Sequence, residues 1–150
     1  MYKSRLNQNL SILRRELSAL QNSRFSKTRD FIQHGKTSVY KHSVSVAYTS
    51  CVIAARLNLT VDTQKMIRGA LLHDYFLYDW HLKDPSHRLH GFTHPKRALV
   101  NASRDFNLSP LERNIISRHM FPLTPIPPVH KEGWIVTMAD KYCSIMEIFT

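Results

Sequence analysis

The chain has 150 residues, of which 43% are hydrophobic and 21% are charged. This length predicts one domain over residues 1–150, and the composition excludes a disordered chain and a bilayer-spanning segment. The net charge of +10 favours acidic partners such as phosphorylated metabolites, nucleic acid or anionic surfaces, although the basic residues form no compact block. The chain lacks the apolar core of a signal peptide, and its two cysteines indicate neither a disulfide framework nor a thiolate zinc site, so we expect a cytoplasmic protein.

Residues 1–21 predict an N-terminal helix that packs on the core. Five leucines recur there at alternating steps of four and three, which forms one apolar helical stripe: Leu6, Leu10, Leu13, Leu17 and Leu20. A coiled coil is the alternative, but the stripe spans barely two heptads.

Residues 22–31 are polar and predict a connector. The largely apolar run over 38–57 favours a buried helix, although its β-branched residues leave a strand as the alternative.

Two helices are predicted in the middle of the chain. Asp62 can cap a helix over 64–76 by accepting hydrogen bonds from the first free N–H groups. The polar, proline-containing stretch 79–91 predicts a loop. Pro95 suits the first turn of the next helix, over 94–106.

The last third of the chain contains clear helix signals. Ser109 and Glu112 form a capping box with a proline between them, which predicts a helix through roughly Arg118. Four prolines exclude regular helix over 121–129, and a final helix is predicted from near Lys131. No alternating pattern is long enough to predict a sheet. We therefore predict an all-α, single-domain helical bundle of about six to seven helices.

Nine histidines stand out against only eleven acidic residues. Imidazole is the commonest metal ligand in proteins. Four histidines and two aspartates lie in the interiors or at the ends of the predicted helices: His42, His73, Asp74, His94, His119 and Asp140. This donor set suits one or two divalent transition-metal ions (Fe, Mn, Co, Ni or Zn) better than Ca²⁺ or Mg²⁺. The alternative interpretation is a set of ordinary helix-end side chains that interact with helix dipoles.

The ordered series His, His-Asp, His, His, Asp resembles the HD-domain superfamily of metal-dependent phosphohydrolases over residues 38–145. The segments GALLHDY, IISRH and ADKYCS carry this resemblance, and a weaker similarity points to the small bacterial diadenosine tetraphosphate hydrolases. The resemblance implies that His42, His73, Asp74 and Asp140 bind one metal ion, and that His94 and His119 complete a second, with a single ion as the alternative. It also implies hydrolysis of a nucleotide or a related small phosphate ester or anhydride by metal-activated hydroxide.

Further candidates surround these ligands. Asp79 is the candidate catalytic acid, or the group that orients water, and Asp74 would bridge the two ions. Five cations flank the proposed ligands and are candidates to bind substrate phosphates: Lys41, Lys96, Arg97, Arg118 and Lys141. His34 and His130 have no helpful context and are predicted to lie at the surface.

Two other functions remain open. Family members often have Lys or Glu shortly after the His-Asp pair, whereas this chain has Tyr75, Phe76 and Leu77. That departure leads to the alternative hypothesis that the protein is a catalytically silent sensor of metal or nucleotide. The net charge motivates a basic nucleic-acid-binding module, but the sequence contains no recognition helix or basic arm. A steep salt dependence of binding without any metal dependence would favour the nucleic-acid module.

Overall fold

The computed structural model describes residues 1–78 and 90–149, with the side chains of 90–92 excepted. Within these residues the protein consists of seven helices and one short hairpin. They are α1 (Tyr2–Leu20), the 3-10 helix η1 (Arg24–Asp30), β1 (Ile32–His34), β2 (Thr37–Ser38), α2 (Val39–Arg56), α3 (Thr63–Leu72), α4 (His90–Asp105), α5 (Pro110–Arg118) and α6 (Lys131–Ile148). The prediction of an all-α bundle is confirmed.

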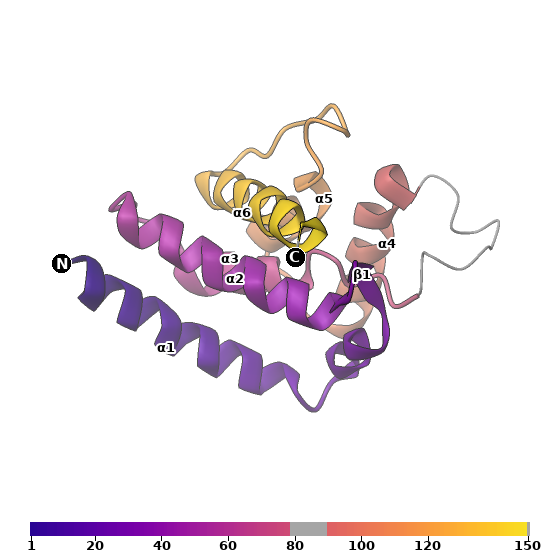
Figure 1. The fold of residues 1–150 in the computed structure, drawn as a ribbon, viewed down its shortest axis with the longest axis horizontal. Helices are drawn as coiled ribbons and strands as arrows, with labels where there is room; N and C mark the ends of the chain where they lie inside the picture. The colour runs from indigo at the N-terminus through magenta and orange to yellow at the C-terminus, as the bar shows by residue number, and fades with distance from the viewer. Residues whose placement is uncertain (79–89, 150) are drawn as a thin grey trace.

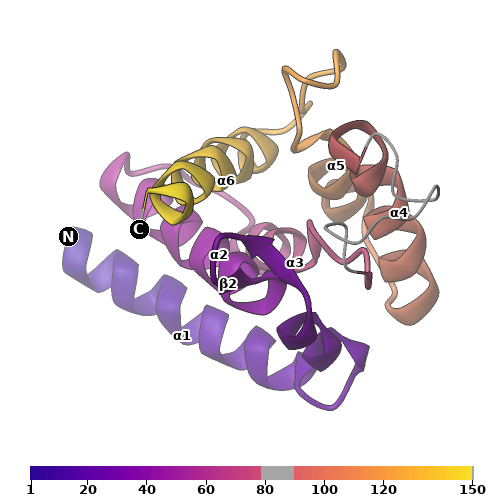
Figure 2. The ribbon, with the colours of Figure 1, turned by 45° about the vertical axis from the view of Figure 1, so that its right-hand side comes forward.

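Helix α2 lies at the centre of the bundle. It packs against α1, α3 and α6, with α1 along one side of it and α6 along the other (Figures 1 and 2). Helix α5 packs against α3, α4 and α6, and so joins the α4 end of the molecule to the rest. This arrangement brings one end of α3, one end of α5 and the middle of α6 toward the same region.

Helix α1 is the ordinary packing helix that its leucine stripe predicts. Leu13 and Leu20 are buried, and the other three leucines are partly buried against the same core. The helix packs on α2 and α3 of its own chain, so its apolar face has a partner inside the domain. The next segment, expected to be a connector, forms η1 because Ser23 caps it and Phe25 is fully buried.

The predicted caps are present. The Asp62 side chain accepts a hydrogen bond from the Lys65 backbone N–H at the start of α3. Ser109 and Glu112 make both bonds of the capping box that begins α5. However, α3 ends at Leu72 rather than continuing to residue 76. The His-Asp pair therefore lies just beyond the last turn of the helix.

Two expectations about local structure were wrong. Helix α4 begins at His90, inside the expected 79–91 loop, so Pro95 is its sixth residue rather than part of its first turn. A proline at this depth removes one backbone hydrogen bond close to the helix start, where the helix can still tolerate the loss. No sheet was expected, yet β1 and β2 pair antiparallel across a two-residue turn. Strands of three and two residues are too short for a period-two pattern.

No helix among the described residues is long and apolar enough to cross a bilayer.

Candidate metal centre

Six side chains from five segments of the chain converge in the middle of the bundle. They are His42 on α2, His73 and Asp74 at the end of α3, His94 on α4, His119 at the end of α5 and Asp140 on α6. All six are buried, and none is more than 6% exposed. The structure thus brings together every residue that the sequence analysis proposed as a metal ligand.

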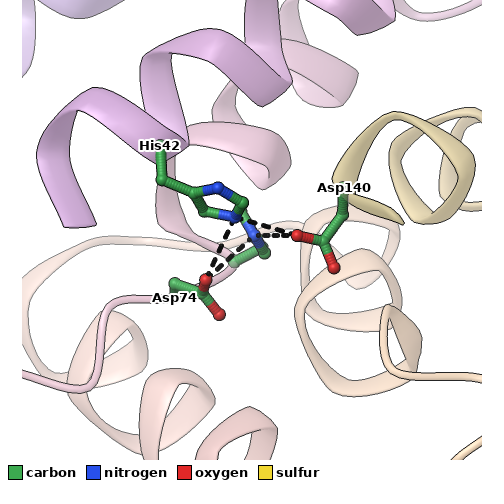
Figure 3. A group of neighbouring side chains, drawn as sticks. His42, Asp74 and Asp140 are labelled. Atoms are coloured by element: carbon green, nitrogen blue, oxygen red, sulfur yellow. Dashed lines mark hydrogen bonds and ion pairs between the residues drawn. The ribbon is translucent and has the colours of Figure 1, made fainter. Parts of the chain in front are cut away.

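The first group of ligand atoms belongs to His42, His73, Asp74 and Asp140, and these atoms all lie within 4.8 Å of one another. Asp140 Oδ1 is 2.9 Å from His42 Nε2 and 3.3 Å from His73 Nε2. Asp74 Oδ2 is 3.4 Å from His42 Nε2 and 3.2 Å from His73 Nε2. Figure 3 shows the Asp74 and Asp140 carboxylates directed at the same edge of the His42 ring, where both approach Nε2.

The second group consists of Asp74, His94 and His119. Asp74 Oδ1 is 3.1 Å from His94 Nε2 and 3.4 Å from His119 Nε2, and the two imidazole nitrogens are 3.0 Å apart. Asp74 therefore takes part in both groups and presents a different oxygen to each. A carboxylate in this position can join two neighbouring cations.

Hydrogen bonds fix which nitrogen of three rings faces the centre. The Nδ1 atoms of His73 and His119 donate to the carbonyls of Ala70 and Ile116, at 2.6 and 2.8 Å. These carbonyls lie in the last turns of α3 and α5, where helix carbonyls lack helical partners. Because a carbonyl only accepts, Nδ1 bears the proton and Nε2 of the neutral ring directs its lone pair at the centre. His42 is oriented in the same way by the Glu147 carboxylate, whose two oxygens each lie 2.9 Å from its Nδ1.

These donor atoms fit a divalent cation. In the second group, the His119 lone pair and Asp74 Oδ1 converge beside His94, and Asp74 Oδ1 is buried without a well-oriented hydrogen bond from any described residue. One small divalent cation among these atoms would satisfy all of them. The complete set of four imidazoles and two carboxylates is typical of a first-row transition metal. The first and second groups can each hold an ion.

The close packing of the four side chains in the first group shifts the pKa value of each of them. Burial alone would lower the pKa of His42, but its hydrogen bonds to Asp140 and Glu147 outweigh that effect and raise the pKa to about 9. Burial would also lower the pKa of His73, yet the neighbouring Asp74 and Asp140 carboxylates raise it well above its usual value. The pKa values of both aspartates fall well below normal despite burial, because the imidazoles stabilise their charged forms. A bound cation would take the place of the protons on the His42 and His73 rings and balance the same carboxylate charges.

This balance predicts an unusual pH dependence for chelator-treated protein. The pKa of His42 is about 6.5 when unfolded and about 9 when folded, so its contribution is complete below pH 6.5 and is lost as the pH rises through 9. We expect the free energy of unfolding to fall by roughly 3 kcal/mol over that window, as measured by urea denaturation in excess chelator. Metal-loaded protein should show the opposite trend, because protons compete with the metal for the imidazoles. A flat profile for both samples would contradict this assignment of charges.

The HD domain family model matches residues 39–145 of the chain. The chain belongs to the HD-domain family. Searches of curated proteins and of solved structures returned no match. Members of the HD family are generally metal-dependent phosphohydrolases, and the matched range includes all six candidate ligands.

Two residues that contact the ligands were not predicted from the sequence. Glu147, which orients His42, lies seven residues after Asp140 on α6, so the two carboxylates share one face of the helix two turns apart. That spacing was a usable signal. Gln33 lies on β1 and donates to Asp74 Oδ2 at 2.7 Å. No pattern in the sequence indicated Gln33, because its contact with Asp74 depends on the β1–β2 hairpin.

The candidate phosphate-binding cations of the HD domain lie in different settings. Lys96 and Arg97 line a pocket of about 530 Å³, and Lys41 is exposed on α2. Arg118 donates to the Pro127 carbonyl at 3.0 Å. Half-buried Lys141 donates to the His119 carbonyl at 3.3 Å, and burial lowers its pKa. Of these five, Lys96 and Arg97 are the two that line this pocket.

Other predictions about the surroundings of the site have mixed outcomes. The candidate acid Asp79 lies outside the described residues. His34 was expected at the surface, but it is half-buried and its ring stands edge-on to His42, with 5.7 Å between the ring centroids. The hairpin causes this difference, because it folds His34 back onto the start of α2. His130 is exposed, as expected.

Proposed function

We propose that the protein is a divalent-metal-dependent phosphohydrolase that acts on a nucleotide or a related small phosphate ester or anhydride. The observation that carries this proposal is the position of Asp74, whose two oxygens belong to two adjacent groups of ligand atoms. When bound, the divalent ions would supply Lewis acidity, which makes water nucleophilic near neutral pH and neutralises charge on phosphoryl oxygens.

The protein's own residues would supply ligands, orientation and charge. His42, His73, Asp74 and Asp140 would hold one ion, and Asp74, His94 and His119 would hold the other. Full burial of these side chains excludes bulk water from most of the centre, which strengthens electrostatic interactions there. Asp79 remains a candidate for protonating the leaving group.

A pocket beside the second group supports a small phosphorylated substrate. It is lined by Phe76, Tyr78, Thr93, Lys96, Arg97, Val100 and Asn101. The Phe76 ring contacts the ring of His94, with 5.8 Å between the centroids, so the pocket adjoins the metal ligands. Its volume of about 530 Å³ falls within the range of roughly 300–1,000 Å³ that is typical of small-molecule sites. Cationic and aromatic side chains in one pocket are suited to a phosphate and a nucleobase, respectively.

A metal-reconstitution assay tests this function. Protein purified without oxygen would be analysed for metals, stripped with a chelator and reloaded separately with Fe²⁺, Mn²⁺, Co²⁺, Ni²⁺ or Zn²⁺. Phosphate release would then be measured for nucleoside mono-, di- and triphosphates, simple phosphate esters and diadenosine tetraphosphate. We expect at least one metal to restore hydrolysis at least about 100-fold above the stripped sample, since metal supplies several kcal/mol of transition-state stabilisation. Hydrolysis that chelation leaves unchanged would contradict the proposal.

The alternative is a catalytically silent sensor that binds metal and nucleotide. One observation favours it: the three residues after the His-Asp pair provide no acid or amine to the centre. The Tyr75 hydroxyl donates instead to Asp105 at 2.6 Å, and Phe76 packs against His94. Tight nucleotide binding in the reconstituted protein, without turnover for any metal in the assay, would support the sensor.

A further inference from the structure

The β1–β2 hairpin holds Gln33 directly against Asp74. Gln33 is the buried central residue of β1, only 5% exposed, and its amide lies 2.7 Å from Asp74 Oδ2. Because an ionised carboxylate only accepts hydrogen bonds, the amide atom facing it is the NH₂ group, Nε2. This chemistry fixes the orientation of the amide, and Oε1 is therefore the atom directed elsewhere.

The Gln33 Oε1 atom is buried and has no hydrogen-bond partner among the residues that the structure describes. The two terminal atoms of a planar amide are about 2.3 Å apart, so Oε1 lies within about 5 Å of Asp74 Oδ2. A buried, unpaired amide oxygen is unfavourable, and native proteins contain few of them. This one lies beside the carboxylate that both groups of ligand atoms share.

The hairpin is held in place on two sides, so the position of Gln33 is well defined. β1 packs against α2 and α6, and the His34 ring stands edge-on to His42. The turn depends on Gly35, whose φ of +54° is unfavourable for other residues. A Cβ atom at Gly35 would lie 3.5 Å from the Glu147 carbonyl oxygen, which shows how closely the turn approaches the end of α6.

We propose that Gln33 is a further residue of the site, with two roles. Its amide N–H orients the shared carboxylate of Asp74, and its Oε1 accepts a hydrogen bond from an O–H group bound next to Asp74. That O–H belongs either to the attacking water or to a hydroxyl of the substrate. The first role concerns the candidate metal centre alone, whereas the second rests on the proposed hydrolytic function. Gln33 lies outside the part of the chain that matches the HD family model.

The replacement Gln33→Met tests the first role, since it removes both polar atoms and largely keeps the side-chain volume. The matched control is Gln64→Met, which removes a glutamine–carboxylate hydrogen bond of the same 2.7 Å length, between Gln64 and Glu16. We expect Gln33→Met to weaken metal binding about 10- to 100-fold, the usual effect of losing a residue that orients a ligand. Titration calorimetry and the visible absorption of bound Co²⁺ would measure this without any assay of activity. Metal binding and a Co²⁺ spectrum equal to those of Gln64→Met would overturn the first role.

The second role is tested by turnover at saturating metal, with a nucleotide and with a phosphate diester that lacks hydroxyl groups. We expect Gln33→Met to lower kcat at least about 10-fold. An equal loss on both substrates identifies water as the O–H donor, whereas a loss confined to the nucleotide identifies a substrate hydroxyl. Unchanged kcat in Gln33→Met on both substrates would overturn the acceptor role. Failure of the proposed function is distinct, because the unaltered protein would then be inactive.

Discussion

Replacing Asp74 with asparagine is expected to remove bound metal from both groups and to lower hydrolysis by at least about 10³-fold. Each group depends on one oxygen of this carboxylate. Asparagine offers one acceptor oxygen and no charge, so it cannot serve two cations. The amide would also turn N–H donors either toward Gln33, which is itself a donor here, or toward the imidazoles. A 10³-fold loss corresponds to about 4 kcal/mol, which is the scale of stabilisation that bound metal supplies.

The matched control for Asp74→Asn is Asp62→Asn. Asp62 caps the other end of α3 and is exposed, and asparagine is as good a helix cap as aspartate. Elemental analysis would give metal per chain, phosphate release would give the rate, and circular dichroism would confirm that each variant folds. Wild-type metal content and turnover in folded Asp74→Asn would contradict the two-group assignment.

Replacing His119 with alanine is expected to reduce bound metal from two ions to one per chain. His119 belongs only to the second group, whereas the first group retains all four of its ligands. Its ring is 99% buried and its Nδ1 is held by the Ile116 carbonyl, so no exposed side chain can take its place. The remaining ion should have the affinity of the first site, and turnover should fall by at least about 100-fold because one cation of the pair is missing.

Loading with Mn²⁺ gives this prediction a readout that does not depend on activity. Two Mn²⁺ ions that share the Asp74 carboxylate are magnetically coupled, whereas a lone Mn²⁺ gives the spectrum of an isolated ion. We expect the electron paramagnetic resonance spectrum to change from the first kind to the second in His119→Ala. His130→Ala is the control, since His130 is exposed and its side chain makes no cap hydrogen bond. A single ion per chain in the unaltered protein would show that the centre is mononuclear.

The helices and the convergence of the ligands could be predicted because they depend on local or strongly patterned signals. Ser109 and Glu112 specify the start of α5 through two hydrogen bonds within four residues. The six ligands are chemically distinctive, and their order along the chain resembles that of a known family. The structure places these six side chains close together, while their binding of metal stays a prediction.

What the sequence did not predict depends on tertiary packing. Gln33 is an ordinary polar residue until the hairpin brings it to Asp74, and strands this short show no periodicity. His34 enters the site region for the same reason. The end of α3 was placed too late, because the apolar pattern continues through Tyr75 and Phe76, which are buried although they lie beyond the helix. Hydrophobic periodicity reports burial here and not helical conformation.

Two side chains that orient ligands, Gln33 and Glu147, lie outside the part of the chain that matches the family model. Gln33 precedes the matched region 39–145 and Glu147 follows it, while all six ligands lie inside. A protein trimmed to those family boundaries would keep every coordinating atom and lose both of the groups that aim Asp74 and His42. Asp74 and His42 would be free to reorient, whereas His73 and His119 would keep their bonds to the Ala70 and Ile116 carbonyls, so such a minimal domain should bind metal more weakly than the full chain even where it folds.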